Sequence, residues 1–131
     1  MLVVEDDVEV RELVRVALTA DGYEVASVDN GREAMHYLRS HADVCIVLLD
    51  LALPIMDGAQ FRTAQLRDRA LAWIPLVVMS GSADAARDAR ELGARRLVRK
   101  PLDVDELRNA LRFVGCYQSR SRRPAAVPPP S

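Results

Sequence analysis

Residues 44–50 read VCIVLLD, an apolar run that ends at a carboxylate. A run without any polar position predicts a strand that is covered on both faces, as in a parallel sheet. Residues 76–79, LVVM, form a second run of this kind, and residues 2–4, LVV, form a shorter one. Asp50 stands out because it places a charge directly after a segment that carries none.

Helical patterns alternate with these apolar runs. Apolar residues recur at helical spacing, and Asp21-Gly22 and Gly93 are expected to end two of the helices. Strands that alternate with helices of this length predict an α/β fold with a parallel sheet between two helical layers. The expected helices cover residues 10–18, 33–39, 61–64, 85–92 and 104–114, and the two remaining strands cover residues 23–28 and 97–98.

The composition excludes several classes of protein. The chain has 131 residues and a formal net charge of -1, which suit one domain without a global affinity for nucleic acid. No stretch approaches the ~20 apolar residues of a membrane span, and the N-terminal residues lack the basic segment of a signal peptide. Two cysteines are too few for a disulfide framework. We therefore expect a cytoplasmic protein.

The last residues differ from the rest of the chain. Residues 116–131 contain three arginines, four prolines and no acid. Such a segment cannot bury enough apolar surface to offset the entropy lost on ordering. We therefore predict one domain over residues 1–115, followed by a flexible tail or linker over residues 116–131.

Polar residues follow four of the five predicted strands. Ligands of parallel sheets bind beyond the carboxyl ends of the strands, so these residues are candidates for a site. Adjacent carboxylates repel one another, and Mg²⁺ prefers oxygen ligands, so the acids favour a magnesium site. A solvated loop at the start of the first helix remains an alternative reading of the first acids. The strand-end residues are Glu5, Asp6 and Asp7, then Asp50, Ser80 and Lys100.

Lys100 is the single lysine among 18 basic residues. A compact ammonium suits a phosphate group as a point charge, whereas a guanidinium is bulkier. Together with the hydroxyl of Ser80 and the acids, Lys100 indicates a magnesium-assisted phosphoryl site.

These motifs resemble the receiver domain of two-component response regulators over residues 1 to about 115. The resemblance implies a flavodoxin-like, doubly wound, five-stranded parallel sheet in the order 2-1-3-4-5, with five helices in three layers. The motifs are VVEDD at residues 3–7, LLDL at 48–51 with Pro54, MDG at 56–58, SG at 80–81 and KP at 100–101.

The resemblance also implies roles for individual residues. Asp50 corresponds to the phosphoacceptor, and Lys100 and Ser80 to the groups that contact its phosphoryl oxygens. Asp6, Asp50 and the backbone carbonyl of Ala52 correspond to direct Mg²⁺ ligands, and Glu5 to a ligand that acts through water. Pro101 corresponds to a proline that often follows a cis peptide bond.

The implied activity is signalling rather than enzymatic turnover of a separate substrate. The implied partners are a sensor histidine kinase or phosphotransfer protein, and an effector or second copy on the surface of the fourth helix, fifth strand and fifth helix. Neither a membrane nor nucleic acid is an expected partner of this domain. Leu97 stands where the family usually has an aromatic residue, and the segment from Ser80 to Lys100 is slightly short.

Two alternatives remain open. A receiver-like scaffold would bind partners without being phosphorylated, which Leu97 favours and the intact acids oppose. A phosphatase with an aspartyl nucleophile usually has an Asp-x-Asp motif after its first strand, where this chain has Glu5-Asp6-Asp7.

Overall fold

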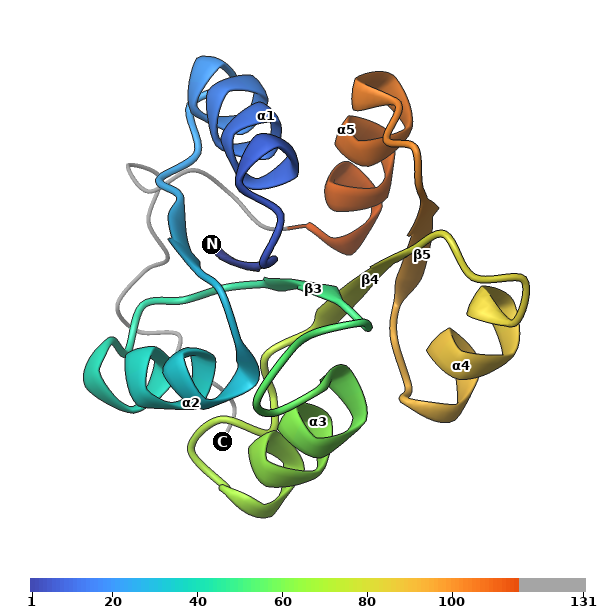
Figure 1. Cartoon of the computed structure of the whole chain (residues 1–131). Helices are drawn as coiled ribbons and strands as arrows, with labels where there is room; N and C mark the ends of the chain where they lie inside the picture. Colours follow the sequence, from blue (N-terminus) through green and yellow to red (C-terminus); the bar gives the residue numbers. More distant parts are fainter. Residues whose placement is uncertain (116–131) are drawn as a thin grey trace.

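A computed structural model describes residues 1–115 of the chain (Figure 1). Strands and helices alternate along the whole of this range, as the apolar runs predict. The elements are β1 (Leu2–Val4), α1 (Val8–Ala20), β2 (Ala26–Val28), α2 (Gly31–Ser40), β3 (Val47–Asp50), α3 (Gly58–Arg67), β4 (Leu76–Ser80), α4 (Ala85–Glu91), β5 (Arg96–Arg99) and α5 (Val104–Val114). The predicted tail, residues 116–131, lies outside the described residues.

The five strands form one parallel sheet in the order β2-β1-β3-β4-β5, which confirms the predicted fold. The register pairs Val4 with Leu49, and Asp50 with Met79. The chain therefore brings the ends of β1, β3 and β4 to one edge of the sheet. This edge is where the polar residues of the sequence motifs follow their strands.

Helices cover both faces of the sheet, with α1 and α5 on one face and α2 and α3 on the other (Figure 1). Successive strand residues point to opposite faces. In β3, Val47 and Leu49 join the core beneath α2 and α3, while Leu48 joins the core beneath α1 and α5. This double coverage explains why β3 and β4 are apolar at consecutive positions.

Side-chain caps define where four helices begin. Asp7 accepts hydrogen bonds from the amides of Glu9 and Val10 at the start of α1, and Asp103 caps α5. The other two caps are Asn30 at α2 and Asp57 at α3. Each cap satisfies amides that have no partner within the helix.

Three features differ from the sequence patterns. The second strand is limited to Ala26–Val28, because residues 23–25 do not pair with β1. In α3 the buried side chains include Arg62 and Gln65, which is why apolar spacing describes this helix poorly. Helix α4 has only 7 residues, in line with the short segment between Ser80 and Lys100.

No helix within residues 1–115 combines the length and the apolar character that a membrane span requires.

Candidate functional site

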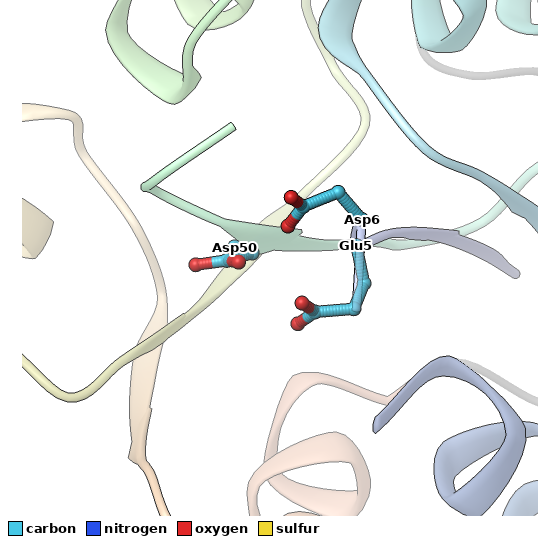
Figure 2. Close-up of side chains that lie close together, drawn as sticks. All are labelled: Glu5, Asp6 and Asp50. Atoms are coloured by element: carbon cyan, nitrogen blue, oxygen red, sulfur yellow. The ribbon is translucent and has the colours of Figure 1, made fainter. Parts of the chain in front are cut away.

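Three carboxylates from two neighbouring strands meet at the edge of the sheet. Asp50 is the last residue of β3, and Glu5 and Asp6 directly follow β1. One carboxylate oxygen from each of the three residues lies within 4.8 Å of the other two. Figure 2 shows the three carboxylate groups directed to the same side, although Glu5 and Asp6 leave the chain in different directions. The structure thus brings these sequence-predicted residues together.

The three acids differ in burial. Glu5 and Asp50 are buried, with exposures of 0% and 5%, whereas Asp6 is exposed. Asp50 Oδ1 accepts a hydrogen bond of 3.1 Å from the Ala52 amide, and Glu5 Oε2 accepts one of 3.1 Å from the Asp7 amide. The buried acids are therefore held by the backbone of their own loops, while Asp6 faces solvent.

Lys100 joins two of these acids from the end of β5. Its Nζ lies 2.8 Å from Glu5 Oε1 and 3.2 Å from Asp50 Oδ2. The contact with Asp50 is also a hydrogen bond, whereas Glu5 Oε1 is not aligned with a hydrogen-bond donor. The Lys100–Glu5 contact is an ion pair, because the two opposite charges lie within 4 Å of each other. The Lys100–Pro101 peptide bond is cis.

Burial and neighbouring charge shift the pKa values of Glu5 and Lys100 in opposite directions. Burial raises the pKa of the Glu5 carboxyl, and this effect exceeds the lowering caused by Lys100. Burial alone would lower the pKa of Lys100, but the close contact with the Glu5 carboxylate and the charge of Asp50 raise it above its ordinary value. Lys100 therefore keeps its positive charge beside Glu5, whereas burial disfavours the charged form of Glu5, which a further cation would favour.

Ser80, the last residue of β4, lies near this cluster. Its hydroxyl oxygen accepts a hydrogen bond of 3.1 Å from the Ser82 amide, and its carbonyl accepts one of 3.0 Å from the Lys100 amide. Asp50, Ser80 and Lys100 line one open depression of about 350 Å³. Its remaining lining residues are Leu51, Ala52, Gly81, Ser82 and Asp88.

The donor set fits a divalent cation of the magnesium type. Carboxylate oxygens are the ligands that Mg²⁺ prefers, and Mg²⁺ usually keeps several waters, which the exposed side of Asp6 permits. Glu5 Oε1 is buried with the Lys100 ammonium as its charged neighbour, and burial still raises the pKa of Glu5, so a further cation beside this acid would be favourable. Among residues 1–115, the cluster of Glu5, Asp6 and Asp50 is the grouping of metal-ligating side chains that could hold an ion.

The sequence motifs did not predict two features of the site. Lys100 pairs with Glu5 as well as with Asp50, and Asp88 of α4 lines the depression. The strand-end rule does not reach a residue in the middle of a helix, so the pattern contains no signal for Asp88. Asp7, by contrast, serves as the cap of α1.

Comparisons with known proteins show which family the chain resembles. The family model of the response regulator receiver domain matches residues 1–112. The transcriptional regulatory protein KdpE of Staphylococcus aureus is 34% identical over 116 residues, which cover 87% of this chain and 48% of that protein. The chain thus spans about half the length of this relative.

Two further relatives resemble the chain over most of their own length. Sporulation initiation phosphotransferase F of Bacillus subtilis is 29% identical over 113 residues, covering 86% of this chain and 90% of that protein. The crystal structure of a putative response regulator from Chloroflexus aurantiacus is 26% identical and superposes with a TM-score of 0.80, covering 86% of this chain and 93% of that one. The extent of the family match establishes that this chain belongs to the response regulator receiver domains.

Proposed function

We propose that this domain is a phosphorylation-dependent signalling receiver in which Asp50 accepts a phosphoryl group with the help of Mg²⁺. The observation that supports it most directly is the position of Lys100, whose ammonium lies beside both Asp50 and Glu5. The donor would be a phosphohistidine of a sensor histidine kinase or phosphotransfer protein. The similarity to a relative named as a phosphotransferase agrees with such a donor.

Phosphoryl transfer requires an in-line nucleophile and neutralisation of charge, and little other covalent chemistry from the protein. An Asp50 carboxylate oxygen would form a bond with phosphorus while the bond between phosphorus and the donor imidazole breaks. The electron pair of the broken bond stays on the imidazole nitrogen. Lys100 would then pair with one phosphoryl oxygen, and the Ser80 hydroxyl would donate a hydrogen bond to another.

Asp6, Asp50 and the Ala52 carbonyl would hold the Mg²⁺ directly, and Glu5 would act through a bound water. When bound, the ion supplies positive charge opposite the phosphoryl oxygens. The domain would catalyse only its own phosphorylation and dephosphorylation, with no separate substrate turned over. We expect it to act in the cytoplasm.

The expected output is a change at the surface of α4, β5 and α5. Contacts from the phosphoryl group to Ser80 and Lys100 would draw in the loop of residues 81–84 and bias this surface between two arrangements. Leu97 is half-buried and packs against the core beneath α2 and α3. The readout would therefore rely on the loop rather than on an aromatic ring at position 97, with an effector or a second copy as the partner.

Intact mass measurement after incubation with a small phosphodonor and Mg²⁺ tests the proposal. We expect one phosphate adduct, which a chelator prevents and Asp50→Ala or Asp50→Asn abolishes. Asp84→Asn is the matched control, because Asp84 is an exposed acid on the neighbouring loop and lies outside the depression. This control should gain the adduct as the original chain does.

The other outcomes separate the competing functions. Absence of an adduct under every condition, with a folded chain, would support the scaffold that binds partners without being phosphorylated. Sustained hydrolysis of unrelated phosphomonoesters would support a phosphatase instead. Either result would overturn the proposed function.

A further inference from the structure

The depression beside Asp50 has an acidic residue, Asp88, on its helical wall. Strand ends and loops supply most of its lining, including Asp50, Ser80 and Lys100, whereas Asp88 comes from α4. A phosphoryl group on Asp50 would occupy this same depression. Asp88 therefore contributes a negative charge to the space through which an anionic phosphodonor must approach.

The positive charge of the depression is already engaged. Among its lining residues in the described part of the chain, Lys100 is the single cation, and it pairs with Glu5 and Asp50. Asp88 has Arg87 as a neighbour at 3.9 Å, but Arg87 lies closer to Asp84, at 3.3 Å. The charge of Asp88 is thus only weakly compensated, and its side chain is 37% exposed.

The backbone holds Asp88 in place at this wall. The Asp88 amide donates to the Asp84 carbonyl at 2.9 Å, and the Asp88 carbonyl accepts from the Leu92 amide at 3.0 Å. Arg62 of α3 donates hydrogen bonds to the carbonyls of Leu92, at 2.8 Å, and Gly93, at 3.4 Å, just beyond the end of α4. These bonds anchor the C-terminal end of the short helix, so Asp88 cannot move far without breaking them.

We propose that Asp88 is a specificity-determining residue that disfavours small, highly charged phosphodonors at Asp50. This inference rests on the proposed function of Asp50 as a phosphoacceptor. Like charges repel, and the repulsion is strongest where water is partly excluded. A macromolecular donor has contacts outside the depression that offset this repulsion, whereas a small anion has none. Asp88 thereby favours phosphorylation by a protein partner over phosphorylation by free metabolites.

Rates of phosphorylation with two small donors test this role. In the presence of Mg²⁺, Asp88→Asn should accelerate phosphorylation by the doubly charged acetyl phosphate about threefold to tenfold, as expected for removal of one nearby like charge. Acceleration with the singly charged phosphoramidate should be smaller. The difference between the variant and the original chain should shrink in about 1 M salt, where the screening length falls to about 3 Å.

Two control variants separate the position of the charge from its mere presence. Glu91→Gln removes one carboxylate charge at the end of α4, where Glu91 is exposed and lies outside the depression, so its rate should stay close to that of the original chain. Asp88→Glu keeps the charge and should not accelerate the reaction. Thermal unfolding of each variant identifies any change that arises from altered folding.

The outcomes distinguish this inference from the proposed function. If Asp50 is phosphorylated at the same rate in the original chain and in Asp88→Asn, the role of Asp88 is wrong while the receiver function stands. An equal acceleration by Glu91→Gln, or one that is independent of donor charge and salt, likewise overturns the role. If neither chain is phosphorylated by either donor, both the function and this inference are wrong.

Discussion

Lys100 Nζ lies 2.8 Å from Glu5 Oε1, although 95 positions separate the two residues in the chain. The ion pair connects the end of β5 to the end of β1 across the two strands that lie between them. It also directs the ammonium toward Asp50. Several expected properties of the protein depend on this placement and on the contacts that support the neighbouring loops.

Replacement of Lys100 by arginine should impair phosphorylation of Asp50, because the larger guanidinium cannot take the place of the ammonium between two buried acids. We expect a reduction of roughly tenfold in the rate measured with a small phosphodonor, as for loss of one charged contact in the transition state. Arg99→Lys is the control, since Arg99 is exposed and should tolerate the change. Equal and negligible effects of the two substitutions would remove Lys100 from the site.

Glu5→Gln should change how stability depends on pH in the presence of a chelator. The folded-state pKa of Glu5 is raised by burial, so its contribution to stability is present at acidic pH and is lost as pH rises through that pKa. Glutamine does not titrate, so the variant should gain free energy of unfolding relative to the original chain as pH rises above the ordinary pKa of a glutamate. Urea denaturation at several pH values measures this difference, and a constant difference across the range would contradict the direction of the shift.

Gly31→Ala should destabilise the fold. A Cβ atom at Gly31 would lie 2.6 Å from the carbonyl oxygen of Met56, which also accepts a hydrogen bond from the Gly31 amide. Backbone cannot move aside as easily as a side chain, so we expect a loss of about 1–3 kcal/mol in the free energy of unfolding. Gly81→Ala is the control for urea denaturation, because its Cβ would lie 3.5 Å from the nearest atom. Equal stability of the two variants would contradict the close approach of Gly31 to the Met56 carbonyl.

Ile55→Asn should stabilise the protein. Ile55 is 65% exposed and has a φ of 64°, a left-handed conformation that is unfavourable for a β-branched residue. Asparagine adopts this conformation more readily, so the free energy of unfolding should rise by about 1 kcal/mol. Ile55→Val, which keeps the branched side chain, should leave it nearly unchanged. A melting temperature that falls in the asparagine variant would show that the left-handed backbone is not a source of strain.

Arg62 and Gln65 should behave as a coupled pair. Arg62 donates to Gln65 Oε1 at 2.8 Å, and Gln65 donates to the carbonyls of Leu71 and Ile74 at 3.1 and 3.0 Å. Each single change to leucine leaves buried polar groups without partners, at a cost of about 1–3 kcal/mol.

The double variant should lose less free energy of unfolding than the two single variants lose together, because each single change already removes the Arg62–Gln65 hydrogen bond. A double-mutant cycle by urea denaturation measures the coupling. Arg67→Leu provides an exposed control on the same helix, with an expected change of about 0.5 kcal/mol or less. Strict additivity would indicate that Arg62 and Gln65 act independently.

Local patterns sufficed for the architecture and for the candidate residues at the strand ends. Apolar runs such as VCIVLL at residues 44–49 predict buried strands, because every position must be apolar when both faces are covered. Once parallel strands are expected, Asp50 and Ser80 are expected at the same edge of the sheet. These inferences depend on residues close together in the chain and on a rule that applies to every sheet of this class.

Tertiary structure alone decided the contacts within the site. The Lys100–Glu5 ion pair depends on how the ends of β1 and β5 approach each other, and Asp88 reaches the depression because of the position of the short helix α4. Arg62 and Gln65 are polar in sequence yet buried, because their side chains bond to backbone carbonyls outside their own helix, Leu92 for Arg62 and Ile74 for Gln65. Periodicity records which face of an element is apolar, whereas such contacts depend on packing between elements, which no local pattern encodes.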